Sequence, residues 1–331
     1  MFIIESYSIA VIFCLITMVC WGSWANTQKL AAANWWFELF YWDYVLGIVL
    51  LATVFALTLG SLGSQGRSFW PDLQQASITN IGSAYLGGVI FNAANILLGA
   101  AISIAGMSVA FPVGIGLALV IGVVVNYIDQ PVGQSTLLFS GVGFIVIAIV
   151  LNATAYRQAS AYRQGVSGKG LLLAVVSGAM MGLFYKYVAQ AMFPDFAQPQ
   201  PGKLSPYSAV LLFSLGILAS NLVFNTLLMY RPFVGAPVSY GQYWKGNRTN
   251  HVMGILGGII WCIGMSFNIL ASDKAGPAIS YGLGQGATVI AAIWGIYVWN
   301  EFKGAPSSTQ TLLRLMLGFY VVGLGLIIAA R

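Results

Sequence analysis

Long apolar runs follow one another along the whole chain. They lack the alternation of apolar and polar residues that marks a membrane β-barrel strand, and each is about as long as the roughly 20 residues that a helix needs to cross a bilayer. The gaps between them are short, so consecutive helices are expected to be antiparallel neighbours with no soluble domain between them. The runs predict ten membrane-spanning helices, at residues 6–30, 36–62, 79–103, 106–128, 136–156, 170–192, 206–230, 250–271, 276–300 and 309–330.

The composition supports an all-α membrane protein. Of the 331 residues, 59% are hydrophobic and 7% are charged, against about 25% charged residues in a typical globular domain. The mean hydropathy of +0.84 describes the whole length and not one end of it. The first run carries Glu5 at its head and is too long for a signal peptide, so it is interpreted as a mature span. The cysteines Cys14, Cys20 and Cys262 lie inside apolar runs without metal or disulfide spacing.

The cations predict how the chain is oriented in the membrane. If the helices alternate in direction, the gaps after odd-numbered spans hold most of the Lys and Arg, and the positive-inside rule places these gaps in the cytoplasm and both termini outside. The net charge of +6 therefore indicates topology and not nucleic-acid binding. The side with the odd gaps holds Lys29, Arg157, Arg163, Lys169, Arg231, Lys245, Arg248, Lys303 and, at the start of span ten, Arg314, and the other side holds Arg67, Lys203, Lys274 and Arg331.

A repeat with an offset of 170 residues divides the chain into two halves. Leu86-Gly87-Gly88 recurs as Leu256-Gly257-Gly258, and Ala105-Gly106 recurs as Ala275-Gly276, without a gap in register. The repeat maps spans three and four onto spans eight and nine. A displacement of five helices reverses the membrane direction, so the sequence predicts a five-plus-five inverted-topology repeat, the build of many secondary transporters. The predicted halves are 1–157 and 170–331, joined by a short loop at 158–169.

Neutral polar and aromatic side chains inside the spans are the candidates for a binding site. Amides offer both donors and an acceptor, and polar groups in hydrocarbon tend to face the bundle interior, where they either contact a ligand or join helices. Aromatic rings well inside a span can serve as stacking platforms for a sugar or a heterocycle. The set predicted to bind a neutral polar substrate is Trp21, Ser23, Trp24, Asn92, Asn95, Phe111, Asn225, Trp261, Asn268, Tyr281 and Gln285.

Charged side chains inside the spans are few. Asp43 is expected about 10 Å into the second span, from the helical rise, where desolvation makes it a candidate for coupling transport to a proton; the alternative is an interfacial or paired carboxylate. Glu38 and Lys186 are the other intramembrane charges, with Lys186 either paired or snorkelling to the interface.

No catalytic pattern is present in the sequence. The sole histidine, His251, stands at a span boundary, so a histidine-based metal site or triad cannot be assembled. The segment Gly165–Lys169 lacks the spacing of a nucleotide phosphate loop. We expect no enzyme activity, no metal and no cofactor.

The ordered motifs resemble the ureide permease family of the drug/metabolite transporter superfamily. The resemblance runs over nearly the full length. Each motif is short, and it is their order and spacing together that make the resemblance specific. They are Ile4-Glu5-Ser6, Asp43-Tyr44, Asn126-Tyr127-Ile128-Asp129, Gly141-Val142-Gly143, Tyr230-Arg231-Pro232 with Gly235 and Pro237, and Trp294-Gly295-Ile296 with Glu301.

The resemblance implies proton-coupled import of a neutral oxo-heterocycle such as allantoin, uracil or xanthine. Trp21-Gly22-Ser23 and Gly106-Met107-Ser108 are also similar to the glucose/ribose and rhamnose uptake families, so a sugar permease is the alternative. A membrane sensor that transports nothing is a third class. The plant members have a longer central loop with a phosphate-loop-like sequence, which this chain lacks. The expected surroundings are a bacterial inner membrane and its lipid, with the chain as monomer or homodimer.

Overall fold

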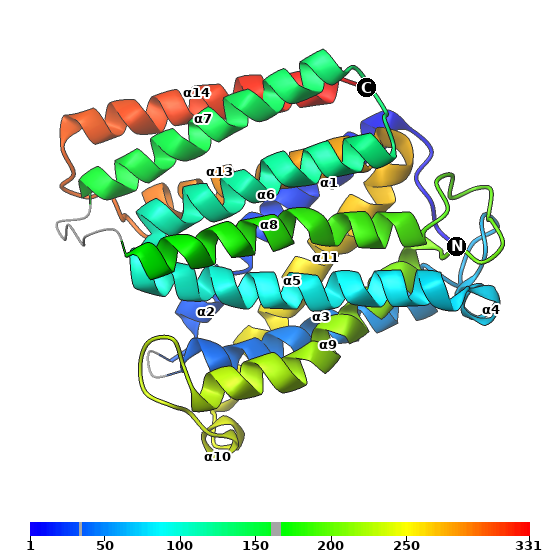
Figure 1. The fold of residues 1–331 in the computed structure, drawn as a ribbon, viewed down its shortest axis with the longest axis horizontal. Helices are drawn as coiled ribbons and strands as arrows, with labels where there is room; N and C mark the ends of the chain where they lie inside the picture. Colours follow the sequence, from blue (N-terminus) through cyan, green and yellow to red (C-terminus); the bar gives the residue numbers. More distant parts are fainter. Residues whose placement is uncertain (33–34, 160–166) are drawn as a thin grey trace.

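The computed structural model describes residues 1–32, 35–159 and 167–331, except for the side chains of residues 107–109 and 111. In this part of the chain, ten helices are long and apolar enough to cross a membrane, as the sequence predicts. The protein is an all-α integral membrane protein, with the long helices stacked side by side (Figure 1).

The helices follow the apolar runs closely, and short interfacial helices lie between some of them. The spans comprise α1 (Tyr7–Ser23) with α2 (Asn26–Leu30), α3 (Phe37–Leu57), α5 (Ile78–Ala105), α6 (Met107–Asp129), α7 (Ser135–Ala159), α8 (Gly168–Ala191), α9 (Pro206–Tyr230), α11 (Arg248–Ala275), α12 (Pro277–Gly284) with α13 (Ala287–Ile293) and the π-helical η1 (Trp294–Val298), and α14 (Ser307–Ala329); α4 (Phe69–Gln75) and α10 (Tyr240–Trp244) are the short helices.

The ninth span is broken where the sequence predicts one continuous helix. Gly284 ends α12, Gln285 and Gly286 form a turn, and α13 begins at Ala287. Glycine on both sides of Gln285 lowers the helix propensity at this point. The break places Gln285 within the ninth span and away from its ends, a feature that transporters use where a broken helix lines a cavity.

Helices α5 and α11 have matching geometry at the 170-residue offset. Each has 28 residues, and both their first and last residues are 170 positions apart. The glycines that follow them have similar positive φ angles, 78° at Gly106 and 83° at Gly276. A Cβ placed on Gly88 would overlap the Phe213 carbonyl oxygen on α9, and a Cβ on Gly258 would overlap the Tyr44 carbonyl oxygen on α3. The local equivalence is therefore observed, while the opposite membrane sense of the two copies and the boundaries of the halves remain predictions.

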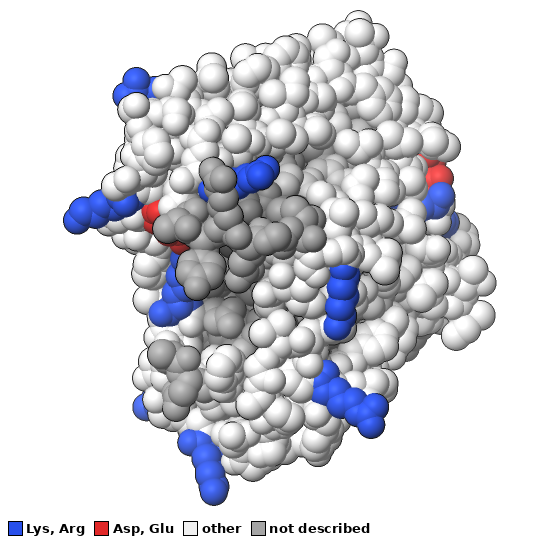
Figure 2. All heavy atoms as spheres, turned by 60° about the vertical axis from the view of Figure 1, so that its left-hand side comes forward, with Lys and Arg blue, Asp and Glu red and all other residues white. Residues whose placement is uncertain are grey.

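The two ends of the helical bundle differ in charge. Among the described residues, the gaps after odd-numbered spans lie at the end of the molecule with α2 and α10, and both termini and α4 lie at the other end (Figure 1). Viewed toward the first end, Lys and Arg side chains gather on the surface (Figure 2). We call this end the cation-rich end.

Interactions between loops join the helices at the end away from the cations, and we call this group the outer seal. The Arg67 guanidinium contacts Asp72 at 3.2 Å, and the fully buried Asp72 carboxylate accepts from the Ser205 N–H at 2.7 Å. The Asn80 Nδ2 donates to the Gly202 carbonyl at 2.8 Å. These bonds connect the segment around the start of α5 with the loop before α9, and the two segments are far apart in the sequence.

A related contact is present at the cation-rich end. The Asn250 Oδ1 accepts from the Ala32 N–H at 2.9 Å. Asn250 and Ala32 are 170 residues from Asn80 and Gly202, respectively, so the two asparagine contacts correspond in the repeat. The position that corresponds to Asp72 is Gln242, which caps α10 through Ser239 and makes no ion pair.

Candidate functional site

A cavity of about 770 Å³ extends from the cation-rich end into the middle of the bundle. Its mouth is lined by residues at the ends of spans, such as Ser103, Tyr156 and Glu301, and its floor by mid-span residues such as Trp21 and Trp261. Among the described residues, none from the outer seal lines it. The cavity is thus open toward one side of the membrane and closed toward the other.

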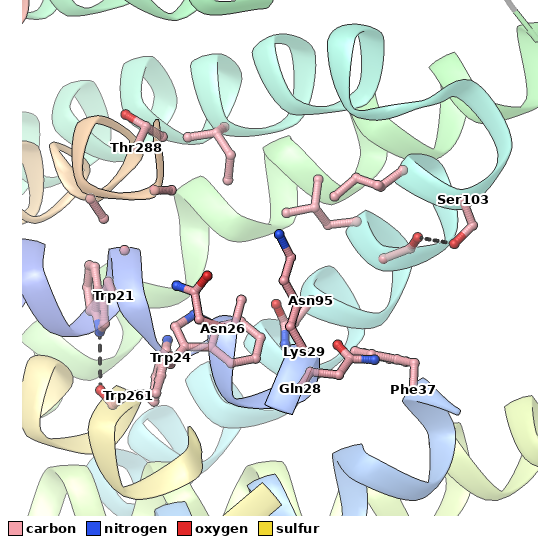
Figure 3. A pocket seen from close by; sticks show the side chains of 18 of the residues that line it. Trp21, Trp24, Asn26, Gln28, Lys29, Phe37, Asn95, Ser103, Trp261 and Thr288 are labelled. Atoms are coloured by element: carbon pink, nitrogen blue, oxygen red, sulfur yellow. Dashed lines mark hydrogen bonds between the residues drawn. The ribbon is translucent and has the colours of Figure 1, made fainter. Parts of the chain in front are cut away.

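Stacked aromatic rings form the floor of the cavity. Trp21 of α1 and Trp261 of α11 lie nearly parallel, with ring centroids 5.9 Å apart, and the Trp21 Nε1 donates to the Trp261 carbonyl at 3.2 Å (Figure 3). Phe91 of α5 packs on Trp261 at 4.5 Å and on Phe184 of α8 at 5.2 Å. Four spans therefore contribute to one apolar surface with π faces.

Neutral amides stand above and beside this floor. The Asn95 Nδ2 donates to the Tyr41 hydroxyl at 3.1 Å, and Asn95 projects toward the cavity (Figure 3). Gln285, at the break in the ninth span, lines the cavity, and its side chain makes no hydrogen bond to the described residues. Asn152 of α7 also lines the cavity, and its Oδ1 has no partner in the described structure. Amide groups left open in this way can pair with the N–H and C=O groups of a ligand.

Several of the predicted site residues join helices and do not line the cavity. Asn92 accepts from the Tyr41 hydroxyl and donates to the Ser220 hydroxyl, both at 2.9 Å. The Asn268 Nδ2 donates to the Ser280 carbonyl at 2.7 Å, and the Asn225 Nδ2 donates to the Glu38 carbonyl at 2.9 Å.

The remaining predicted aromatic and hydroxyl residues have different surroundings. The buried Tyr281 hydroxyl donates to the Ala118 and Met181 carbonyls at 3.2 and 3.1 Å. Ser23 accepts from the Trp294 Nε1 at 2.8 Å, whereas Trp24 lines the cavity. Phe111 has its side chain outside the described part of the structure. The structure therefore brings Trp21, Trp24, Trp261, Asn95 and Gln285 together around the cavity.

Charged residues occur at the mouth of the cavity and not at its floor. Lys29 of α2 pairs with Glu301 at 2.8 Å, and the Tyr156 hydroxyl donates to the same carboxylate at 2.8 Å. The Lys29 ammonium also lies 4.6 Å from the Trp299 ring centroid. Glu38 lines the cavity near its mouth.

Asp43 lies outside the cavity in a buried polar cluster. Its side chain is 3% exposed, its Oδ1 accepts from the Tyr243 hydroxyl at 2.7 Å, and its Oδ2 lies 2.9 Å from the His251 Nδ1. Burial, together with the hydrogen bond to Asp43, raises the pKa of the Tyr243 phenol, so Tyr243 remains a hydrogen-bond donor at neutral pH. Lys186, the other predicted intramembrane charge, pairs with Asp129 at 3.0 Å.

Sequence reasoning missed two groups of residues that the structure brings to this region. His251 stands at a span boundary, where the sequence gives it no role, yet it meets Asp43, which is 208 residues away. Asn152, Lys29 and Glu301 also went unassigned. An amide inside the fifth span was a usable signal for Asn152, whereas the partners of Lys29 and His251 cannot be deduced from spacing.

Among the described residues, no group of three or more His, Cys, Asp or Glu side chains is placed to hold a metal ion. The arrangement that the structure does provide is a bundle of ten spans around a one-sided cavity with an aromatic floor and open amides. These features define the protein as a polytopic membrane permease.

Comparison with known proteins gives the family. The ureide permease family profile matches residues 40–166 and 162–330, and the chain belongs to the ureide permease family, whose members are transporters and not enzymes. Ureide permease 1 of Arabidopsis thaliana is 24% identical over 390 residues, covering 100% of this chain and 99% of the relative. Ureide permease 4 of the same plant is 22% identical with the same coverage, and the probable ureide permease A3 of Vigna unguiculata is 20% identical over 81% of this chain and 89% of its own.

A solved crystal structure has the same fold. It superposes with a TM-score of 0.57 at 15% sequence identity and covers 96% of this chain and 96% of its own. At this identity the match concerns the fold alone.

Proposed function

We propose that this protein is a secondary active transporter that imports a neutral ureide or a related oxo-heterocycle. The observation that carries the proposal is the floor of the cavity, where stacked rings of Trp21 and Trp261 lie beside amides with free hydrogen-bonding groups. A planar heterocycle can stack on the rings, and its carbonyl and N–H groups can pair with Asn95 and Gln285. The names of the relatives support a ureide as the substrate.

The distribution of charge favours a neutral substrate. Lys29 and Glu301 neutralise each other at the mouth, and the residues of the floor are aromatic or amide side chains. An ionised substrate at the floor would lack a partner of opposite charge, and burying an unpaired charge in the membrane is costly.

The proposal includes coupling to a proton through Asp43 and insertion with both termini outside. Asp43 is the buried carboxylate next to a histidine, and the cation-rich end would face the cytoplasm by the positive-inside rule. The named relatives are plant proteins and give no support to the bacterial inner membrane that the sequence analysis expected. The two halves of the predicted inverted repeat would move against each other around the cavity, to which α1 and α5 of the first half and α8 and α11 of the second contribute residues.

Transport by purified protein in proteoliposomes tests the function. We expect counterflow of radiolabelled allantoin that unlabelled uracil inhibits more strongly than unlabelled rhamnose does. Stronger inhibition by rhamnose would identify a sugar permease, to which the tryptophan floor is also suited. Binding of allantoin without counterflow would identify a sensor.

Variants of the floor locate the binding site. Replacing Trp21, the partly exposed tryptophan of the floor, by Ala removes a stacking surface, and stacking of a heterocycle on an aromatic ring contributes about 1–3 kcal/mol, so KM should rise roughly 5- to 150-fold. Trp70→Ala is the matched control, because Trp70 is 63% exposed on α4 and lies outside the cavity. Equal KM values for the two variants would exclude the floor as the substrate site.

A further inference from the structure

The cluster around Asp43 joins three helices, one of which, α10, has no residue in the lining of the cavity. Asp43 belongs to α3, Tyr243 to α10 and His251 to α11. A Cβ on Gly254 would overlap the Asp43 side chain, so the absence of a side chain at this position lets α3 approach α11. The packing thus places the carboxylate within hydrogen-bond distance of the imidazole.

The surroundings of Asp43 leave few groups that can share its charge. Tyr243 and His251 are the titratable side chains that bond to it in the described structure. Lys245 and Arg248, on the same side of the cluster, are exposed and form no ion pair with it among the described residues, and Asn225 on the neighbouring α9 is neutral. When the imidazole is neutral, the pair therefore carries one net negative charge, and one added proton makes it neutral.

His251 connects this buried carboxylate with water. Its side chain is 26% exposed, against 3% for Asp43, and it lies at the cation-rich end of α11. With Nδ1 directed at Asp43, Nε2 is the ring atom that can exchange a proton with solvent. Gly246 allows this orientation, because a Cβ at that position would stand 2.7 Å from Nε2.

Aromatic contacts join the cluster to the cavity. The Trp35 ring lines the cavity and meets the His251 ring edge-on at 5.2 Å and the Tyr243 ring at 6.2 Å. Next to Asp43 in sequence, Tyr44 packs on the cavity residue Trp24 at 4.6 Å. A change in the helix positions around the cavity would therefore also change the surroundings of the pair.

We propose that His251 and Asp43 together form the proton-binding site of the transporter, with Nε2 of His251 releasing the proton to water at the cation-rich side and Tyr243 orienting the carboxylate. The inference rests on the proposed function and assigns the coupling to a pair of residues in place of Asp43 alone. Protonation removes the net charge of the pair, and a neutral pair can move through the membrane interior at lower cost than a charged one. His251 is a positioning and relay residue, since it does not touch the substrate cavity.

Two transport assays in proteoliposomes separate coupling from substrate movement. The first is allantoin counterflow at equal pH on both sides, and the second is allantoin accumulation driven by a pH gradient. We expect His251→Gln to keep counterflow within about twofold of wild type, to lose gradient-driven accumulation at least tenfold, and to flatten the pH profile of uptake. Lys245→Gln, which removes an exposed neighbouring charge, should behave as wild type in both assays.

The other outcomes of the two assays overturn either the proton site or the proposed function. If His251→Gln accumulates allantoin with the wild-type pH profile, or loses counterflow together with accumulation, the inference is overturned. Wild-type protein that shows counterflow but no gradient-driven accumulation would overturn the proton site and leave substrate transport standing. Wild-type protein without counterflow would overturn the proposed function, and this inference with it.

The sole histidine also allows a direct measurement. In protein labelled with ¹⁵N-histidine and freed of any histidine tag, the imidazole signals report His251 alone. Because Nδ1 lies 2.9 Å from the Asp43 Oδ2, Asp43→Asn should move the ¹⁵N signal of Nδ1. An unchanged Nδ1 signal would show that the two groups do not share the proton.

Discussion

Glycine residues set how closely the central helices approach. Gly258 of α11 faces the backbone of Tyr44 on α3, and Gly88 of α5 faces the backbone of Phe213 on α9. In lipid, helices associate through close packing more than through the hydrophobic effect, so positions without a side chain matter at such crossings. The crossing at Gly258 adjoins both the cavity floor and the Asp43 cluster, since Tyr44 follows Asp43 on α3 and its ring lies 6.5 Å from the Trp261 ring of the floor.

Replacing Gly258 by Ala should destabilise the protein. The new Cβ would overlap a backbone carbonyl, which cannot move aside as a flexible side chain can, and such overpacking costs about 1–3 kcal/mol. Thermal unfolding in detergent should show a lower Tm. Gly143→Ala on α7 is the control, because a Cβ there meets nothing within 4 Å. Equal Tm values for both variants would contradict the packing argument.

For single residues, the sequence predicts burial better than it predicts whether a side chain contacts a ligand or another helix. Asn92, Asn225 and Asn268 are fully buried, as polar residues within apolar spans should be. Burial satisfies the same energetic requirement whether the partner is a ligand or another helix, so the pattern could not separate them from Asn95 and Gln285. The pairing of Asp43 with His251 depends on the approach of two distant helices and leaves no local signal.

Among the elements, the short helix α4 joins distant parts of the chain although it has only seven residues. It presents the buried Asp72 to the N-terminus of α9 through the Ser205 N–H, and Gln75 accepts from the Gly202 N–H at 2.6 Å. The long helices and their number were predictable from apolar runs, whereas α4 and α10 are too short and too polar to give such a signal. The break at Gln285 was missed because glycine in a membrane span more often marks packing than a turn.

Removal of the Arg67 charge should loosen the outer seal. Arg67→Gln leaves the buried Asp72 carboxylate without its ionic partner, and losing a charged hydrogen bond of this kind costs about 1–3 kcal/mol. Amide hydrogen exchange in residues 200–208 should become faster. Arg314→Gln, the same substitution at an exposed arginine outside the ion pairs described, should leave this exchange unchanged. Unchanged exchange in Arg67→Gln would show that the ion pair does not hold the loop.

For the whole molecule, orientation decides which compartment the cavity opens into. The cavity mouth and most Lys and Arg side chains share one end, so the positive-inside rule applies to both at once (Figure 2). Ten spans and their order followed from the sequence. The depth and one-sidedness of the cavity did not, because they depend on how the helices tilt and pack.

Labelling with a membrane-impermeant maleimide tests the orientation. In a background without the three native cysteines, Gln65→Cys should react in intact cells, whereas Ser103→Cys at the cavity mouth should react only after permeabilisation. The positive-inside rule gives this direction because Ser103 lies at the cation-rich end. The reverse labelling pattern would place both termini in the cytoplasm.

The asparagine contacts at the two ends of the bundle correspond in the repeat, but the ion pair of Arg67 with Asp72 has no counterpart in the repeat, where Gln242 takes the position of Asp72. The Asn80 side chain binds Gly202 in a loop that also contacts Arg67 and Asp72, whereas the Asn250 side chain binds Ala32 and the neutral Gln242 caps α10. When the contacts that close the two ends of a carrier differ in strength, the carrier without substrate mostly occupies the state in which the weaker contacts are open. We therefore expect the protein without substrate to be mainly inward-open. The slow step of each import cycle would then be the return of the empty carrier to the outward-open state and not the release of substrate into the cytoplasm.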